Sequence, residues 1–478
     1  RSLSLFIYLR CLVCDSRKKL PPGPQALPII GNLHMLGSHP HQKLCSLSKK
    51  YGPIMSIRLG KELAIVVSSP EAAKRFLKTH ETTFLGRPKN QAADRLSYGR
   101  KAMSFSDYGP YWRSLRKLYM VELLSSAKIN SFAGIRRKEV GLAVNSVREA
   151  ALAGQVVDVS AVVAALIENI TYIMIFGESA RDENYKLKHV IEEAMMVVSS
   201  FDLSDYVPNL QAFDLQGIKA RTESAFLLMD KILEAINRGP KDVVDMLLLH
   251  MNYSTNSVEE PRLTVKAIIF ELLTGAIHTS TTAIEWVISE LLQHPRVMKK
   301  LQQEIQSIIG LDRMIEEADL AKFKYLDMVL KESLRLHPVG ELLIPRQSME
   351  DARIEDYHIP KNSIILVNAW AVGRDPDVWS EKVNDFYPER FQDNNIEISD
   401  QNFQLIPFGS GRRSCPGMQL GLRNVKLVVA QLVHCFDWEL PDNMLAGDLD
   451  MSEKHGLTTR RAKNLLARPT NRLHFRNI

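Results

Sequence analysis

The hydrophobic pattern along the chain is mainly helical. Between residues 70 and 294 apolar positions recur at helical spacing, with loops expected at 86–110, 202–208 and 252–261. Two strands are expected earlier, at residues 54–59 and 63–68, on either side of the turn Gly60-Lys61. No internal repeat or flexible linker interrupts the pattern after residue 24. The pattern therefore predicts one large, mainly α domain with a small β region near the N-terminus.

One predicted helix is unusually long. Residues 264–293 are mostly apolar and contain no proline, and at about 1.5 Å per residue they would extend roughly 45 Å. The middle of this helix, residues 274–282, is rich in small and hydroxyl side chains with poor helix propensity. These residues leave space beside the backbone, for either a close helix crossing or a ligand.

The N-terminal segment, residues 1–20, has a different pattern. Residues 2–14 are mostly apolar, and the basic run Arg17-Lys18-Lys19 follows. About 20 apolar residues are needed to span a bilayer, so we expect the remnant of a membrane anchor with a cytoplasmic basic flank, or else a short interfacial helix. The stiff segment 21–24 (Pro-Pro-Gly-Pro) separates it from a single domain, residues 21–478.

Composition and charge narrow the function. The 478 residues are 45% hydrophobic, which is enough for a large core. The net charge of +6 is small for this length and does not suggest nucleic-acid binding, although an acidic protein or anionic lipid could be a partner. Five widely spaced cysteines do not form a disulfide framework and indicate a reducing compartment.

The segment 408–417 (Phe-Gly-Ser-Gly-Arg-Arg-Ser-Cys-Pro-Gly) carries the most specific chemistry. Its glycines allow a tight loop, and a helical pattern follows Pro416 through Leu432. Cys415 therefore precedes a helix N-terminus, where amide N–H groups stabilise a thiolate. Arg413 can reach an acidic group on a cofactor bound by that thiolate. A phosphate loop would end in Gly-Lys-Ser/Thr, which is absent, and the remaining alternative is a structural cysteine in a glycine-rich turn.

The pattern of Phe408, Gly411, Arg413, Cys415 and Gly417 resembles the haem-binding loop of the cytochrome P450 family, in particular its plant microsomal members. The resemblance extends from residue 21 to the C-terminus. It implies the P450 fold, with haem b (iron protoporphyrin IX) between the long central helix and the Cys415 loop. It also implies that the Cys415 thiolate is the iron ligand.

Further segments match the family in order and spacing. Glu332 and Arg335, with Arg390 downstream, resemble its structural Glu–Arg–Arg cluster, although such a pair is often a solvated salt bridge. The resemblance assigns the haem propionates to Trp112, Arg116, Arg346 and Arg413. Without the cysteine loop, Trp112 and Arg116 would be interpreted as part of a basic surface helix.

The oxygen-binding side departs from the family, whose central helix carries small-Gly-x-acid-Thr. Thr279 is retained, but His278 replaces the acid and Ala276 replaces the glycine. Either His278 relays protons, or it only packs and leaves proton delivery to Thr279 and water. The substrate pocket is expected to include Ala276, Leu342 and Leu457. Nearby Glu341 would contact a polar substrate group or, as is commoner for Glu, lie in solvent.

The resemblance implies a monooxygenase that inserts one oxygen atom from O2 into a small lipophilic phenolic or terpenoid metabolite. Electrons would come from NADPH through a flavoprotein reductase, at the cytoplasmic face of the endoplasmic reticulum membrane. The basic residues Arg412 and Lys117 would either dock this reductase or be ordinary surface charge. One alternative is a reductase-independent haem-thiolate isomerase or dehydratase. Another is a haem-binding protein whose turnover is impaired because His278 replaces the acid.

Overall fold

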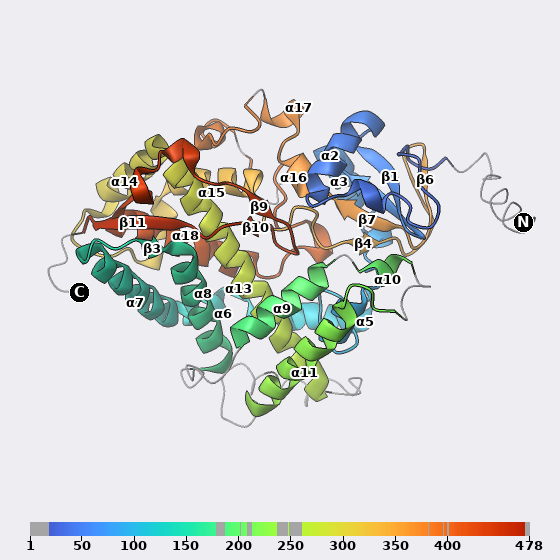
Figure 1. Cartoon of the computed structure of the whole chain (residues 1–478), viewed down its shortest axis with the longest axis horizontal. Coiled ribbons are helices and arrows are strands. Elements are labelled where there is room, and N and C mark those ends of the chain that lie inside the picture. Colours follow the sequence, from blue (N-terminus) through green and yellow to red (C-terminus); the bar gives the residue numbers. More distant parts are fainter. Residues whose placement is uncertain are drawn as a thin grey trace, which may run out of the picture.

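The computed structural model describes residues 19–177, 187–200, 202–207, 213–236, 247, 261–380, 382–394, 396–398 and 401–473. The expected membrane anchor, apart from its last two residues, and most of the expected loop at 252–261 lie outside these ranges. Helices make up most of the described chain, and four small sheets lie among them (Figure 1). The prediction of a mainly α fold is confirmed.

The central helix α13 (Pro261–Gln293) begins three residues before its predicted start and ends where predicted. At about 1.5 Å per residue its 33 residues extend roughly 50 Å. It packs against α8 (Val159–Phe176) and α18 (Met418–Cys435), and together with α7 (Ala133–Leu152), α14 (Pro295–Ile309) and α15 (Lys324–Leu336) these helices build the largest hydrophobic core (Figure 1). Both α8 and α13 are long and apolar enough to span a membrane, but 61% of the most apolar window of each is buried within the fold, as expected for core helices.

The other described α-helices contribute no residue to this core. They are α2 (Pro40–Tyr51), α3 (Pro70–Lys74), α4 (Gln91–Leu96), α5 (Pro110–Leu118), α6 (Ser126–Ser131), α9 (Leu187–Ser199), α10 (Leu203–Tyr206), α11 (Ile218–Ile236), α16 (Ala369–Val372) and α17 (Pro376–Trp379). The expectation of loops at 86–110 and 202–208 was partly wrong, because α4 and α10 lie within them. Asn90 and Asp202 cap these helices with side-chain acceptors, and each helix is too short to show a periodic pattern.

The β region near the N-terminus is larger than the predicted pair of strands. Strands β1 (Ile54–Leu59) and β2 (Glu62–Val67) form the expected hairpin, with the second strand one residue earlier than predicted. However, β7 (Ile364–Val367) joins β2 in parallel, and β4 (Arg346–Gln347) completes the sheet. About 300 residues separate β2 from β7, so hydrophobic alternation within one segment does not reveal this pairing.

Several short strands elsewhere were not predicted. They are β3 (Val157–Asp158), β8 (Phe436–Glu439) and β11 (Leu466–Asn471) in one sheet, the pair β9 (Glu453–Lys454) and β10 (Arg460–Arg461), and the pair β5 (Ala352–Ile354) and β6 (Tyr357–Ile359). The turn between β9 and β10 is tied to the core, because Trp286 Nε1 on α13 donates to the Thr459 carbonyl at 2.9 Å.

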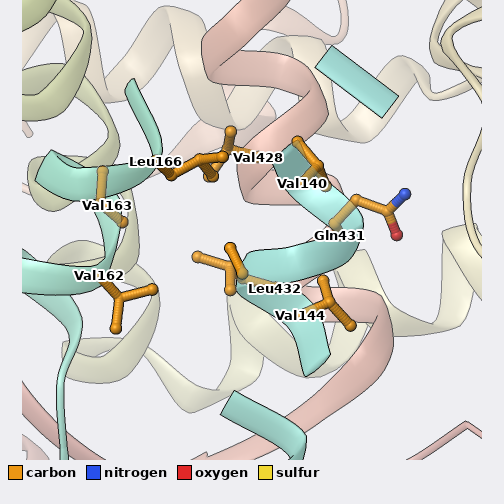
Figure 2. Close-up of a pocket in the computed structure, with 9 residues that line it drawn as sticks. Val140, Val144, Val162, Val163, Leu166, Val428, Gln431 and Leu432 are labelled. Atoms are coloured by element: carbon orange, nitrogen blue, oxygen red, sulfur yellow. The ribbon is translucent and has the colours of Figure 1, made fainter. Parts of the chain in front are cut away.

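A small apolar pocket lies among α7, α8 and α18 (Figure 2). Gln431 is the one polar side chain among the residues that line it, and its amide is already bonded to the backbone of Ile315. We interpret this pocket as a packing gap of the helical core, because it offers a ligand no free polar group.

Candidate functional site

The Cys415 loop is closed by its own backbone. The Cys415 amide donates to the Phe408 carbonyl at 2.9 Å, and the Ser414 amide donates to the Gly411 carbonyl at 3.0 Å. Gly411 has a φ of +72°, and a Cβ at this position would lie 2.8 Å from the Leu77 carbonyl oxygen. Only glycine satisfies both constraints, which explains this part of the motif in physical terms.

The Cys415 side chain lies just before α18. Desolvation by the surrounding protein raises the pKa of its thiol, while the amides of Gly417 and Met418 and the charge of Arg116 act in the opposite direction. The side chain is nevertheless exposed. The thiol is therefore surrounded by protein yet still accessible to a ligand. A metal ion bound there would hold the sulfur as a thiolate.

Four arginines surround this loop and its neighbours. Two of them bind the loop itself: Arg116 donates to the Ser414 carbonyl at 2.8 Å and Arg346 to the Ser410 carbonyl at 2.7 Å. Arg413 donates to the carbonyls of Leu85 and Ser106, both at 2.8 Å. Arg87 donates to the carbonyls of Ile344 and Pro345, also at 2.8 Å. Within the described part of the chain, none of the four has a carboxylate within 4 Å. Burial lowers the pKa of Arg346 and of Arg413 to about 10. These guanidinium groups therefore make no direct ion pair with the described residues, and the carboxylates that act on them, Glu81, Asp107 and Glu271, do so from a longer distance.

Two buried donors at the same place also lack an acceptor. Trp112 Nε1 and Arg346 Nη1 have no hydrogen-bond partner, and both residues are at most 5% exposed. An unsatisfied buried donor costs about 1–3 kcal/mol, more if charged, so such groups indicate a missing partner. A cofactor that carries carboxylates and a metal ion, such as the haem expected from the sequence, fits the unpaired donors, the excess positive charge and the cysteine sulfur.

The middle of α13 is less covered than the parts of the helix on either side of it. Gly275 is exposed, while Ala276, His278 and Thr279 are half-buried, although the residues before and after them are mostly buried. Thr279 Oγ1 donates to the Gly275 carbonyl at 2.6 Å, a bond that slightly loosens a helix. Ile277, on the same turn, packs in one hydrophobic cluster with Trp112 of α5 and Leu420 of α18. The three elements that carry the predicted site thus meet in one region.

Glu332, Arg335 and Arg390 are brought together away from solvent. Arg335 Nε lies 2.8 Å from Glu332 Oε2, and Arg390 Nε lies 2.9 Å from Glu332 Oε1. The Glu332 and Arg335 side chains are fully buried, so this is not a solvated salt bridge. The remaining guanidinium protons go to backbone carbonyls, including those of Gly373 and Trp379. The cluster fastens α15 to the 388–391 turn.

The remaining residues predicted for the substrate pocket and the reductase surface lie in different parts of the fold. Leu342 packs against the cluster around β1 and β2, and Leu457 is half-buried in the turn between β9 and β10. The expectation that Glu341 lies in solvent was wrong, because Glu341 is 1% exposed and contacts two histidines. Arg412 and Lys117 are exposed, and Arg412 pairs with Glu81 at 3.7 Å.

Sequence reasoning missed two residues that shape this region. Glu271 on α13 accepts hydrogen bonds from the amides of Met103 (3.0 Å) and Ser104 (2.6 Å) and from the Tyr119 hydroxyl. Arg87 also donates to the Ser104 carbonyl, at 2.7 Å. Together they hold the 103–106 segment beside Arg413. The one available signal was an acidic residue in an otherwise apolar stretch of the central helix, which by itself does not identify a partner.

Comparisons with known proteins point to a single family. A family model described as "Cytochrome P450" matches residues 21–466. The chain is 52% identical to cytochrome P450 CYP736A12 of Panax ginseng, over 95% of this chain and 94% of that protein. It is 40% identical to the phenylacetaldehyde oxime monooxygenase CYP71AN24 of Prunus mume, over 98% and 93%. A zebrafish cytochrome P450 solved with abiraterone superposes with a TM-score of 0.74 at 26% identity, covering 91% of this chain and 100% of that one.

Proposed function

The chain belongs to the cytochrome P450 family, and from this we propose that it is a haem-thiolate monooxygenase that inserts one oxygen atom from O2 into a small lipophilic metabolite. The observation that carries this proposal is Cys415: an exposed but desolvated thiol at the start of α18, surrounded by arginines without carboxylate partners. Haem, as haem b, supplies the oxygen-activating chemistry when it is bound.

The residues of the site have distinct parts in this proposal. Cys415 is the iron ligand, and the Gly417 and Met418 amides stabilise its sulfur as a thiolate. Trp112, Arg116, Arg346 and Arg413 bind the propionates. This pairing would give acceptors to the two orphaned donors and neutralise the excess charge. Phe408, Gly411 and Gly417 shape the loop that presents the cysteine.

On the other side, Thr279 and His278 serve proton delivery. The Thr279 hydroxyl accepts a hydrogen bond from water while it donates to the Gly275 carbonyl, which fixes the direction of its proton. His278 stands where an acid would replenish protons. A neutral imidazole both donates and accepts hydrogen bonds, but unlike a carboxylate it carries no negative charge and is a weaker proton acceptor. We therefore expect turnover with a raised leak of reducing equivalents.

We also propose an electron donor, a location and a substrate class for the enzyme. Electrons come from NADPH through a flavoprotein reductase that docks near the exposed Arg412 and Lys117. We place the protein at a membrane, on the cytoplasmic face of the endoplasmic reticulum, because its sequence resembles plant microsomal members of the family. The name of the Prunus mume enzyme supports a small aromatic or otherwise lipophilic substrate. Ala276, Leu342 and Leu457 are proposed to line the substrate pocket.

The replacement of the acid by His278 favours a second candidate, a reductase-independent haem-thiolate isomerase or dehydratase. This reaction needs the same Cys415 loop but no proton delivery to bound oxygen. A requirement for NADPH, O2 and reductase in product formation supports the monooxygenase. Product formation without any of the three supports the isomerase or dehydratase.

The first test is the carbon monoxide difference spectrum of the reduced, haem-loaded protein. We expect a long-wavelength Soret band typical of thiolate ligation. Cys415→Ala should abolish this band, while Cys45→Ala, a cysteine on α2, should retain it. A thiolate band that persists in the Cys415 variant, or its absence from folded wild-type protein, would overturn the proposal.

A further inference from the structure

A second group of metal-ligating side chains is assembled from three distant segments of the chain. His41 comes from α2, Glu341 from the segment after α15, and His455 from the turn between β9 and β10. One ligand atom from each lies within 4.8 Å of the others. His41 Nδ1 is 3.2 Å from Glu341 Oε1, and His455 Nδ1 contacts the same carboxylate oxygen. Two imidazoles therefore converge on one carboxylate.

The group is held away from bulk solvent. The side chain of His41 is fully buried and that of Glu341 is 2% exposed, whereas that of His455 is 28% exposed. A carboxylate in the interior requires a partner, and His41 and His455 are the two imidazoles that contact Glu341. The exposed side of His455 leaves an approach for water.

The orientation of His41 points to an ion between it and Glu341. His41 Nε2 lies 3.2 Å from Glu453 Oε2, within hydrogen-bond distance. If Nε2 carries the proton for that bond, Nδ1 presents a lone pair toward Glu341. At 3.2 Å from a carboxylate oxygen, Nδ1 makes no hydrogen bond and remains a buried atom without a partner. A lone pair and a carboxylate oxygen at this distance repel each other unless a cation lies between them.

The spacing of His41 and Glu341 agrees with a common coordination geometry. Two ligands about 2.05 Å from one ion at the tetrahedral angle lie roughly 3.3 Å apart, close to the 3.2 Å between His41 Nδ1 and Glu341 Oε1. His455 Nδ1 lies closer to Glu341 than this, so its side chain would turn away slightly when an ion binds. Two histidines and one glutamate form a known set of zinc ligands. The contact between His41 Nε2 and Glu453 corresponds to the carboxylate that orients a metal-bound histidine in such sites. We propose that His41, Glu341 and His455 bind one divalent transition-metal ion, with Zn²⁺ as the best match and water as the fourth ligand.

The backbone around these residues is fixed independently of any ion. Asn368 Nδ2 donates to the His41 carbonyl at 2.8 Å, the Trp370 amide donates to the Glu341 carbonyl at 3.2 Å, and the Thr459 amide donates to the Val339 carbonyl at 2.9 Å. The ion would therefore bind a preformed site and join α2, at the N-terminal side of the domain, to the β9–β10 turn near the C-terminus. The joining of these two segments by a metal ion is separate from haem binding and does not depend on the proposed reaction.

The competing arrangement needs no metal. A doubly protonated His41 could bridge Glu341 and Glu453 as part of a closed network of ion pairs. The two arrangements differ in a measurable way. The metal site takes up one equivalent of Zn²⁺ that depends on all three ligands, whereas the ion-pair network takes up none.

The test is equilibrium dialysis of untagged, haem-loaded and chelator-treated protein against Zn²⁺. We expect one equivalent of bound Zn²⁺ in the wild type, with affinity at least tenfold weaker in His455→Phe and in Glu341→Gln. His34→Gln, which removes an exposed histidine elsewhere in the N-terminal region, should bind Zn²⁺ as the wild type does. The haem spectrum of each variant reports whether the fold is retained. His455→Phe is the key variant because its side chain is the least buried of the three.

Thermal unfolding provides a second measurement. Zn²⁺ should raise the melting temperature of the wild type and of His34→Gln, but not that of His455→Phe. The proposal is overturned if wild-type protein binds no stoichiometric Zn²⁺, or if His455→Phe binds it with unchanged affinity. Haem loading is scored by its own spectrum, so failure of the metal site would be distinguishable from failure of the proposed function.

Discussion

At the scale of single residues, the region around Cys415 contains four arginines, none of which has a carboxylate within 4 Å among the described residues. Arg346 illustrates this, because one of its terminal nitrogens donates to the Ser410 carbonyl and the other has no partner. An unpaired buried charge destabilises a protein, so its presence is explained by a ligand rather than by folding.

This imbalance leads to a prediction for Arg346→Met. Haem retention should fall at least tenfold, because a propionate partner is lost, while the haem-free protein should be no less stable, since an unpaired buried charge is removed. Haem dissociation rates and the melting temperature of the haem-free protein measure the two effects. Arg353→Met is the control. The Arg353 side chain is 78% exposed, so its replacement should leave haem retention unchanged. A loss of haem-free stability with unchanged haem retention would contradict the prediction.

His278 gives a second prediction at the residue scale. In His278→Asp a carboxylate next to Thr279 should replenish protons more effectively, so product formed per NADPH consumed should rise severalfold. Thr279→Val serves as the counterpart and should lower the same ratio, because the hydroxyl that donates to the Gly275 carbonyl is lost. The measurement is product and peroxide per NADPH with reductase present. An unchanged or lower ratio in His278→Asp would indicate that His278 only packs.

At the scale of elements, the sequence specifies helices better than their connections. The central helix was predictable because its apolar run is long and lacks proline, and the Cys415 loop because glycine, arginine and cysteine occur at fixed spacing. By contrast, α4 and α10 depend on a capping side chain and on tertiary contacts. The burial of Glu341 depends on His41, about 300 residues away in the sequence. Such long-range contacts leave no local pattern.

The Glu332 cluster gives a prediction for how elements are joined. Glu332→Ala leaves Arg335 and Arg390 buried without their shared carboxylate and should cost about 3–5 kcal/mol in the free energy of unfolding. Glu397→Ala removes an exposed partner of Lys331 and should cost about 1 kcal/mol or less. Denaturant unfolding of the haem-free proteins compares the two. Equal costs would mean that burial does not distinguish the cluster from a surface ion pair.

At the scale of the whole molecule, two kinds of packing are present. The core built by α8, α13, α14, α15 and α18 is apolar and complete without a ligand. The region around Cys415 is instead held by arginines that donate to the carbonyls of Leu85, Met103, Ser106 and Ser414. We infer that the arginines that make these bonds to the backbone also bind the haem carboxylates.

This difference predicts a local response to haem removal. When haem is removed, the segments 103–106 and 408–417 should lose hydrogen-exchange protection, because they are held by hydrogen bonds to the charged side chains of Glu271, Arg413 and Arg116, which we place around the haem. The helices α8 and α18, which are buried in the apolar core, should remain protected in both states. Hydrogen exchange followed by mass spectrometry on haem-loaded and haem-free protein makes the comparison, and Arg346→Met should show part of the same loss even with haem bound. Uniform loss of protection across α8 and α18 would mean that haem is required for the core itself, and that the two regions fold as one cooperative unit.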